Sequence, residues 1–418
     1  MKKLTIATLV LLAAITNMAL ASQKRKVLII GIDGVRSDAL QTANTPNIDA
    51  LIATGFYTYD SWHCGITVSG PSWSTIFTGV WFPKHGVTDN SYAGSHFDAY
   101  PYYAKRVKEV KPSLYATQVV DWAPMSTKVT NDGYDAKIVR TENDCAAVAA
   151  AAQTQLLNPN LDAFTLYFAK VDNIGHSSGF SPSNPAYMAA IHEVDSFIGR
   201  VMTTLKSRPT YVSEDWLVLI TTDHGGNGTS HGGNSNVERN IWWIASGKDV
   251  ISRQVMASDP GSYNMSSNPV DPAKLALAPV QADIAVTAMH HLMYDESDLS
   301  LRPENKAAWN LDGKSWLDSM KRSSPPGTAI KETPTSFEQG VKIYPNPSTG
   351  LFTFWFDAQN QSVAYLVFDE AGRLIKSEHN LNIDSKLNID LSEQANGRYF
   401  IQLRCGGQVM TRKVILNK

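Results

Sequence analysis

Cysteine is scarce in this chain of 418 residues, which contains only Cys64, Cys145 and Cys405. Three widely spaced cysteines exclude a disulfide framework and a CxxC zinc motif, because at most one pair can form and one thiol is left over. We interpret Cys64 as a small buried packing residue.

An excess of charge of one sign is also missing. The chain has 37 Lys and Arg against 39 Asp and Glu, which gives a net charge of −2. No basic field favours nucleic acid, and no run of like charges indicates an interaction tail. We therefore expect no nucleic acid polymer among the partners of this protein.

A long apolar stretch occurs at the N-terminus. Lys2 and Lys3 precede "LTIATLVLLAAI", and "ALA" at 19–21 is typical of a signal-peptidase site. The alternative is an uncleaved anchor, but the stretch is short for a spanning helix of about 20 residues. We expect residues 1–21 to be a signal peptide and the protein to be exported.

Apolar runs alternate with amphipathic ones over residues 22–321. We predict helices over 45–55 and 185–207, and strands over 26–33, 113–120, 163–172, 216–223 and 240–247. Continuous apolar strands separated by helices are typical of a mostly parallel sheet with helices on both faces. The predicted fold class is α/β.

The composition changes near residue 322. Residues 322–340 are rich in Pro, Ser, Thr and Gly, as linkers are. Short strand patterns with Gly and Asn turns then follow over 341–418. We predict a linker followed by a small C-terminal β-sandwich.

Three predicted strands end in an aspartate: Asp33, Asp172 and Asp223. The carboxyl ends of parallel strands meet at one edge of a sheet, where ligands bind. Histidines accompany these aspartates in "VDNIGH" and "TTDHGGNGTSHGG". Oxygen and nitrogen donors of this kind suit zinc. Taken singly, each residue could instead be a helix cap, a turn former or a packing histidine.

Ser69 lies in "TVSGPSWSTIFTGVWFPKHG", just ahead of an apolar run. We expect its hydroxyl at the start of a helix, where free N–H groups stabilise negative charge. The alternative is a plain serine helix cap.

Five motifs in order carry a resemblance: "GIDGVRSDAL", "TPNIDALIATG", "SGPSWSTIFTGVWFPKHGV", "VDNIGHSSG" and "TTDHGG" with "SHGG". Over roughly residues 26–320 the chain resembles the alkaline-phosphatase superfamily, in particular its type I phosphodiesterase/nucleotide pyrophosphatase branch. The resemblance implies an alkaline-phosphatase-like fold and a hydrolase of phosphate esters that uses two divalent ions, which the family implies to be zinc. By the same resemblance Asp33, Asp223 and His224 hold one ion beside Ser69, and Asp172, His176 and His231 hold the other.

The chemistry that this implies begins at Ser69. Two ions stabilise the attacking and the leaving oxygen together, and Ser69 attacks as an alkoxide to give a covalent phosphoseryl intermediate. The chain departs from the family at two positions: Ser69 stands where Thr is typical, and Ser72 where an Asn is. We expect Ser72 to donate an O–H bond to the phosphoryl group.

Other activities remain open at this stage. A sulfatase would carry an Arg where Trp73 stands, and its calcium prefers oxygen ligands. A monoesterase usually needs a cationic clamp, whereas we interpret Arg36 and Lys84 as surface charges. Four aromatic side chains could line an apolar pocket for the leaving group of a diester, or belong to the core: Trp62, Trp73, Trp81 and Tyr92. A binding protein without turnover is a further alternative.

The C-terminal segment resembles the sorting domain of the type IX secretion system in "VKIYPNPSTGLFTFWF", "VFDEAGRLI" and "IDLSEQANGRYFIQL". That resemblance implies the type IX machinery as a partner and a secreted or cell-surface location. A carbohydrate-binding sandwich would expose aromatic residues, but Tyr344, Trp355 and Tyr399 also fit core patterns.

Overall fold

The computed structural model describes residues 24–294, 298–321, 341–356, 361–369, 374–405 and 408–418. The chain divides into two compact units, which we call the N-terminal unit (Met1–Arg322) and the C-terminal unit (Ser323–Lys418). The signal peptide and the linker expected at 1–21 and 322–340 lie outside the described residues. Among the residues that are described, no helix has the length and apolar character needed to cross a membrane.

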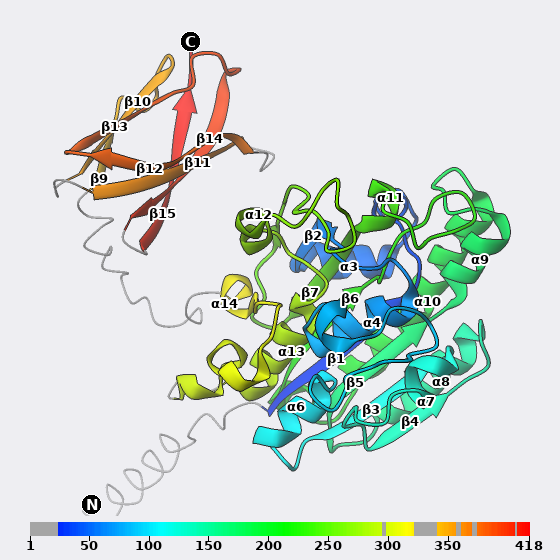
Figure 1. Ribbon diagram of the computed structural model, residues 1–418. Helices are drawn as coiled ribbons and strands as arrows, with labels where there is room; N and C mark the ends of the chain where they lie inside the picture. The colour runs from blue at the N-terminus through cyan, green and yellow to red at the C-terminus, as the bar shows by residue number, and fades with distance from the viewer. Residues whose placement is uncertain (1–23, 295–297, 322–340, 357–360, 370–373, 406–407) are drawn as a thin grey trace, which may run out of the picture. The chain divides into compact units, whose positions relative to one another are not determined.

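The N-terminal unit is built around an eight-stranded sheet (Figure 1). The strand order is β4-β3-β5-β1-β6-β7-β2-β8. The strands are β1 (Lys24–Ile32), β2 (Phe56–Trp62), β3 (Tyr115–Val120), β4 (Ala136–Val139), β5 (Leu161–Phe168), β6 (Glu214–Thr221), β7 (Asn240–Gly247) and β8 (Arg253–Gln254). β7 pairs antiparallel with both of its neighbours, β6 and β2, and the other pairs are parallel. The mostly parallel sheet is therefore confirmed.

Helices cover both faces of this sheet, as predicted. The longer ones are α3 (Pro46–Thr54), α4 (Ser69–Thr78), α6 (Tyr103–Val110), α8 (Cys145–Leu156), α9 (Lys170–Ser178), α10 (Pro185–Lys206) and α13 (Asp283–Met293). Shorter helices are α2 (Ser37–Leu40), α5 (Phe82–His85), α7 (Ala123–Thr127), α11 (Asn236–Arg239), α12 (Pro272–Leu277) and α14 (Leu317–Met320). α4, α6 and α13 share one buried apolar cluster with the sheet, and α3, α8 and α10 share the other. Burial on both faces explains the continuous apolar strands, since all eight residues of β6 are buried.

One predicted boundary was wrong. The strand expected over 163–172 ends at Phe168, where Ile32 of β1 is its last parallel partner. The chain then turns, and Asp172 lies in the first turn of α9 rather than at a strand end. The helix places Asp172 and His176 one turn apart, so that both side chains lie on the same face.

The aromatic residues considered for a leaving-group pocket belong to the core. Trp62, Trp73, Trp81 and Tyr92 are all at most 8% exposed. Cys64 is buried in a small cluster with Trp62 and Trp81, so its predicted packing role is confirmed.

The two basic residues interpreted as surface charges are also engaged. The Arg36 guanidinium pairs with Asp38 and donates to the carbonyl of Phe180. The Lys84 ammonium contacts Asp312 at 2.5 Å and the carbonyl of Asn310 at 2.8 Å. Neither is a freely solvated charge.

The C-terminal unit consists of two antiparallel sheets, of three and four strands, which pack around one apolar core and form a small β-sandwich. The strands are β9 (Val341–Tyr344), β10 (Leu351–Phe356), β11 (Gln361–Asp369), β12 (Leu374–Ile383), β13 (Lys386–Asp390), β14 (Gly397–Cys405) and β15 (Gln408–Leu416). Tyr399 is in the core, but Tyr344 and Trp355 are 50% and 39% exposed. The core interpretation of these two was wrong, because both side chains alternate onto the outer face, where their rings stack.

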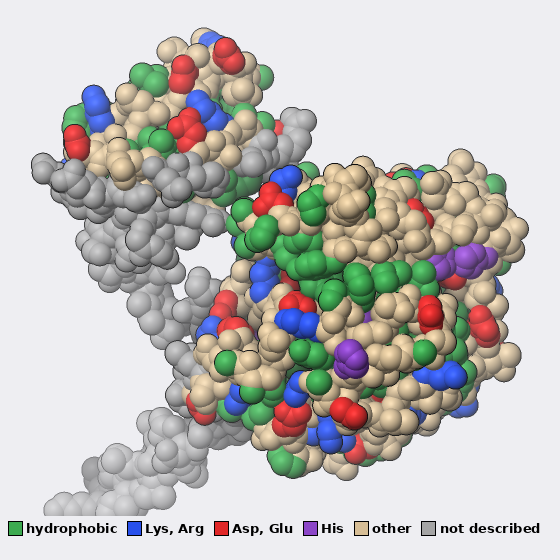
Figure 2. Space-filling model, in the orientation of Figure 1, with side chains coloured by type: hydrophobic (Ala, Val, Ile, Leu, Met, Phe, Trp, Pro, Cys, Tyr) green, Lys and Arg blue, Asp and Glu red, His purple; other side chains and the backbone are tan. Residues whose placement is uncertain are grey.

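Acidic and basic side chains are interspersed over the face seen in Figure 2. This mixture agrees with the net charge of −2.

Candidate metal centre and nucleophile

Six side chains gather at the carboxyl edge of the sheet, and we call them the carboxylate–histidine cluster: Asp33, Asp172, Asp223, His176, His224 and His231. Asp33 directly follows β1, and Asp223 and His224 follow β6. Asp172 and His176 lie on α9, which follows β5, and the loop between β6 and α11 supplies His231. Because β5, β1 and β6 are neighbours in the sheet, residues that are far apart in sequence meet here.

The three histidines of the cluster share one orientation. In each ring Nδ1 lies close to a backbone carbonyl, which can only accept, so Nδ1 carries the proton. In the neutral form of each ring the Nε2 lone pair then faces the aspartates, as in histidines that bind metals. The contacts are His176 to Thr229 O at 3.0 Å, His224 to Gly225 O at 2.8 Å and His231 to Thr67 O at 2.8 Å. His176, whose pKa is raised to about 9, must first lose the proton on its Nε2.

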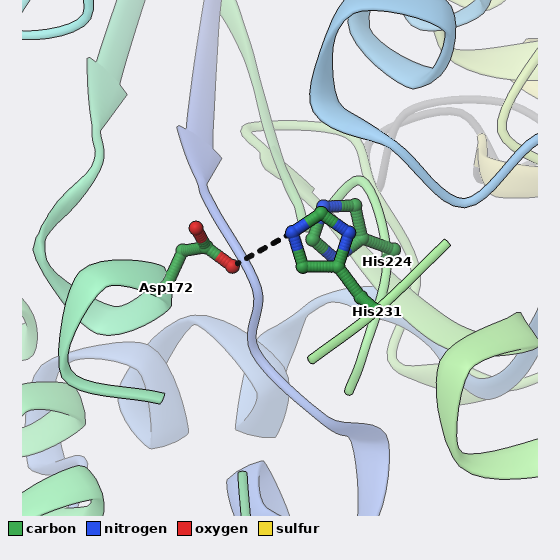
Figure 3. Close-up of side chains that lie close together, drawn as sticks. All are labelled: Asp172, His224 and His231. Atoms are coloured by element: carbon green, nitrogen blue, oxygen red, sulfur yellow. Dashed lines mark ion pairs between the residues drawn. The ribbon is translucent and has the colours of Figure 1, made fainter. Parts of the chain in front are cut away.

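Each aspartate of the cluster offers one buried oxygen that lacks a hydrogen-bond partner among the described residues. These atoms are Asp33 Oδ1, Asp172 Oδ1 and Asp223 Oδ2. Asp223 Oδ2 lies 3.2 Å from His224 Nε2, and Asp33 Oδ1 lies 3.6 Å from the same nitrogen. Asp172 Oδ1 lies 3.6 Å from His231 Nε2, and Figure 3 shows this carboxylate directed at the His231 ring. Buried oxygens without donors, facing nitrogen lone pairs, fit divalent cations.

The potential ligand atoms form two overlapping groups. Those of Asp33, Asp223 and His224 lie within 4.8 Å of one another, and so do those of Asp172, His224 and His231. The sequence placed His176 rather than His224 in the second group. The structure brings His176 there as well, since its Nε2 is 3.3 Å from Asp172 Oδ2 and 3.0 Å from His231 Nε2.

Burial and mutual repulsion shift the pKa values of the aspartates in the cluster. Burial, and then the nearby Asp172, raise the pKa of Asp33 to about 6. Burial, and then Asp33, raise the pKa of Asp223 well above its ordinary value. Burial also acts to raise the pKa of Asp172, but the hydrogen bond from His176 and the neighbouring histidines outweigh it and hold that pKa low. Two buried carboxylates that repel each other favour a positive charge between them.

The pKa values of two histidines move in opposite directions. The hydrogen bond with Asp172 raises the pKa of His176 to about 9. Burial, assisted by the nearby His224, lowers the pKa of His231 to about 4. A neutral His231 keeps its Nε2 lone pair free at neutral pH.

Gly34 allows the backbone to lie close to the aspartates of the cluster. Gly34 has a φ of +68°, and a Cβ on it would lie 2.6 Å from Asp172 Oδ1. Its N–H also donates to Asp223 Oδ1 at 3.1 Å. Gly34 therefore allows the backbone after β1 to pass between two of the three aspartates.

Ser69 is the first residue of α4 and is 6% exposed. Its Oγ lies 3.4 Å from His224 Nε2, so the hydroxyl borders the first group of ligand atoms. The helix cap is Val68, and no side chain there caps the helix, so the alternative of a plain serine cap was wrong.

Ser72 does not face the cluster in the way that the sequence suggested. Its hydroxyl is fully buried and lies 2.7 Å from His63 Nε2, and it donates to the carbonyl of Val68 or Ile66. Because its single proton is directed at these backbone carbonyls, it does not point at a phosphoryl group. The expected direct role of Ser72 is corrected for this reason.

Asn90 was not recognised in the sequence, yet it lies beside Ser69. Its Oδ1 accepts the N–H of Gly70 at 2.7 Å, and Asn90 itself is exposed. With the oxygen engaged, the Nδ2 group is the donor that remains for a ligand.

Two further buried groups support Asp33. Trp73 Nε1 donates to Asp33 Oδ2 at 3.1 Å, and the Tyr167 hydroxyl donates to the same oxygen. Trp73 thus occupies the position of the sulfatase arginine with a fully buried indole, which gives no cationic contact to a substrate.

Comparison with known proteins identifies the family of the N-terminal unit. The model of the family "Type I phosphodiesterase / nucleotide pyrophosphatase" matches residues 27–140 and 128–265. The chain belongs to the type I phosphodiesterase/nucleotide pyrophosphatase family. Every residue of the carboxylate–histidine cluster, together with Ser69, lies inside the matched region of this phosphodiesterase-family chain.

One curated relative is human ectonucleotide pyrophosphatase/phosphodiesterase family member 7, which is 24% identical over 245 residues, 53% of this chain and 53% of the relative. The chain therefore spans about half the length of this relative.

Solved structures share the fold of this family member. Murine ectonucleotide pyrophosphatase/phosphodiesterase 5 is similar with a TM-score of 0.50, at 13% identity, over 64% of this chain and 95% of that one. The phosphonate monoester hydrolase of Agrobacterium radiobacter gives a TM-score of 0.50, at 15% identity, over 94% of this chain and 89% of that one. At these identities the likeness concerns the fold alone.

Residues 342–417 match a secretion system C-terminal sorting domain. This domain indicates export by the type IX system to the cell surface or the extracellular space. The expected location is thus confirmed.

Proposed function

We propose that this protein is a secreted hydrolase of phosphate diesters that uses Ser69 as its nucleophile. One observation carries the proposal: three carboxylate oxygens that lack a hydrogen-bond partner among the described residues face three histidine Nε2 atoms, and one of these, on His224, lies 3.4 Å from the Ser69 hydroxyl. Membership of the phosphodiesterase family supports it independently.

The donor set supports two zinc ions. Neutral imidazoles and carboxylates are the ligands that zinc prefers, whereas calcium takes oxygen ligands almost alone. We assign Asp33, Asp223 and His224 to one ion and Asp172, His176 and His231 to the other. When bound, such ions supply positive charge to the attacking and leaving oxygens and lower the pKa of a hydroxyl or water.

The side chains of the protein would then act in a defined order. Ser69 Oγ attacks phosphorus and forms a P–O bond while the bond to the leaving alcohol breaks and that alcohol takes up the proton lost by Ser69, which gives a phosphoseryl enzyme that keeps the second ester group. Asn90 Nδ2 would donate to a phosphoryl oxygen, while the N–H of Gly70 holds the Asn90 side chain through its Oδ1. Water then hydrolyses the phosphoserine, which releases a phosphate monoester and restores Ser69.

The basic residues near the motifs support a diester over a monoester. A monoester carries more negative charge and usually needs a cationic side chain in addition to metals. The candidates are engaged elsewhere: Arg36 with Asp38, Lys84 with Asp312 and Lys170 with Glu193. The aromatic pocket suggested by the sequence gives no support, because its residues are in the core.

The C-terminal unit has a separate role in this proposal. We assign to it recognition by the type IX secretion machinery, which would carry the N-terminal unit across the outer membrane. A small-molecule phosphate ester is the proposed substrate of the exported protein.

The deciding experiment compares kcat/KM of the zinc-loaded mature protein on bis(p-nitrophenyl) phosphate, p-nitrophenyl phosphate and p-nitrophenyl sulfate. We expect a diester preference of at least tenfold, and loss of turnover with chelator. Ser69→Ala should lower kcat by roughly 1,000-fold or more while metal content is retained.

The control is Ser74→Ala. This buried serine lies on the same helix, and its hydroxyl donates to the carbonyl of Gly70 at 2.7 Å. Its variant should retain most of the activity. A monoester preference would assign the protein to phosphatase chemistry, and turnover of the sulfate alone would overturn the phosphate proposal. Tight substrate binding without turnover, unchanged in Ser69→Ala, would indicate a binding protein.

A further inference from the structure

His63, in the segment between β2 and α4, is a buried histidine that the chemistry above does not use. Its Nδ1 accepts the N–H of Gly65 at 2.9 Å, so the ring proton is on Nε2. That nitrogen lies 2.7 Å from Ser72 Oγ, to which it therefore donates. Burial holds the pKa of His63 well below its ordinary value, so the ring is neutral.

The hydrogen bonds continue from Ser72 to the residue before the nucleophile. Ser72 Oγ lies 2.8 Å from the Val68 carbonyl and 3.1 Å from the Ile66 carbonyl, and we assign its single proton to the shorter contact, to Val68. The Ser72 N–H donates to the same Val68 oxygen at 3.0 Å. Val68 caps α4 but has no side chain able to cap it. The serine hydroxyl thus adds a second hydrogen bond to the carbonyl of the peptide that joins Val68 to Ser69.

His63 is itself held from the other side. Its backbone N–H donates to the Arg239 carbonyl at 2.9 Å, and Arg239 Nε donates to the His63 carbonyl at 3.1 Å. Arg239 is 1% exposed and forms a bidentate pair with Asp259 at 2.6 and 2.7 Å. The ion pair of Arg239 with Asp259 therefore holds Arg239 in place, and Arg239 holds the backbone of His63.

We propose that His63, through Ser72, is a positioning residue that holds the Val68–Ser69 peptide so that the nucleophile faces His224. The inference rests on the proposed function, since it assigns a role toward the Ser69 hydroxyl. Misplacement of a reacting atom by about 1 Å can cost roughly 100-fold in rate, which sets the expected size of the effect.

The chain offers a matched control in a second buried histidine, on α5, that contacts a hydroxyl on α4. His85 is also fully buried, its Nδ1 accepts the N–H of Val87 at 3.1 Å, and its Nε2 lies 3.0 Å from Thr75 Oγ1. This second histidine–hydroxyl pair repeats the first one further along α4. A loss that is merely structural should therefore affect both pairs alike.

The test measures kcat, KM, bound zinc and Tm for the mature protein and its variants on bis(p-nitrophenyl) phosphate. His63→Leu and Ser72→Ala should each lower kcat by roughly 30- to 100-fold with KM within about threefold and zinc retained. His63→Gln should recover most of kcat, because the amide nitrogen of Gln can take the place of Nε2. The double variant should be no worse than either single one, because both act through one hydrogen-bond chain.

His85→Leu should lower Tm to a similar extent but keep kcat within about threefold. Equal loss of kcat in His63→Leu and His85→Leu, or additive losses in the double variant, would overturn the positioning role. An unchanged kcat in His63→Leu beside an active wild type would reject this inference alone. An inactive wild type would reject the proposed function and this inference with it.

Discussion

The backbone N–H of Gly70 donates to Asn90 Oδ1 at 2.7 Å, which ties an exposed loop residue to the first turn of the helix that begins at Ser69. A Cβ on Gly70 would lie 2.6 Å from the Asp89 carbonyl and 2.9 Å from Asn90 Oδ1. The absence of a side chain at position 70 therefore sets the distance between Asn90 and the nucleophile.

The first prediction concerns this contact. Asn90→Ala should lower kcat on a diester by roughly 100- to 1,000-fold, since one donor to the developing phosphoryl charge is lost. Asn90→Asp keeps the acceptor for Gly70 but replaces the donor by a negative charge, so it should be at least as impaired. Steady-state kinetics of the wild type and both variants, with bound zinc measured in each, test this prediction. A kcat within threefold of wild type in both variants would contradict the role of Asn90.

The second prediction concerns removal of metal. Chelation should lower Tm by roughly 5–15 °C, because the aspartates of the carboxylate–histidine cluster then lose the cations that offset their repulsion. Asp33→Asn should reduce this chelator effect. Asp195 is an equally buried aspartate, satisfied by the N–H groups of Asn47 and Ile48, so Asp195→Asn should leave the chelator effect in place. Scanning fluorimetry with and without chelator measures the Tm shift in the wild type and in each variant. An unchanged Tm on chelation in the wild type would argue against a metal centre.

The third prediction concerns the support of Asp33. Tyr167→Phe removes one of two donors to Asp33 Oδ2 and should weaken zinc binding roughly 10- to 100-fold. The control is Tyr103→Phe, since the Tyr103 hydroxyl lies 3.0 Å from Thr165 Oγ1 on the same strand as Tyr167. Zinc titration against a competing chelator should show an affinity within twofold of wild type for the control. Equal weakening in both variants would indicate a general loss of packing.

The fourth prediction concerns acid stability. Burial acts to raise the pKa of Glu214, but hydrogen bonds from Arg208, Trp216 and Thr210 outweigh it and lower the pKa to about 2. Because the unfolded chain binds this proton near pH 4.5, the stabilisation is present above that pH and is lost as the pH falls toward 2. The loss in free energy of unfolding should be about 3 kcal/mol at most.

Glu214→Gln should therefore flatten the pH dependence of the free energy of unfolding between pH 4.5 and 2, measured by urea titration. Glu193→Gln removes a half-exposed carboxylate that pairs with Lys170, and it should change the slope very little. A slope that is the same in Glu214→Gln and in wild type would contradict the buried pairing with Arg208.

The sequence predicted the elements of this molecule whose residues follow a regular apolar pattern. Apolar runs identified β1, β3, β5, β6 and β7, and the aspartates after them indicated the edge of the sheet where the cluster lies. The direction of β7 was not predictable, because an apolar run has the same pattern in a parallel and an antiparallel strand. The position of Asp172 on α9 was missed because the run continues beyond Phe168 without a Gly or Pro signal.

The missed residues of the site depend on contacts between segments. Asn90 lies in a polar loop with no periodicity, and its role is visible only once the loop meets Gly70. His63 precedes the matched nucleophile motif, and nothing in its neighbours indicates that its ring turns toward Ser72. For Tyr344 and Trp355 the sequence was compatible with a core or an exposed position, and the strand alternation puts both side chains outside.

The orientation of the three histidines has a consequence for how this site tolerates change over evolution. Each ring is fixed by a carbonyl of the main chain, at Thr67, Gly225 or Thr229, and every amino acid carries such a carbonyl. The orienting oxygen is therefore preserved by any substitution that keeps the path of the backbone. An insertion or deletion of one residue would displace it. We therefore expect the lengths of these loops to be conserved more strictly among homologues than the residue types within them.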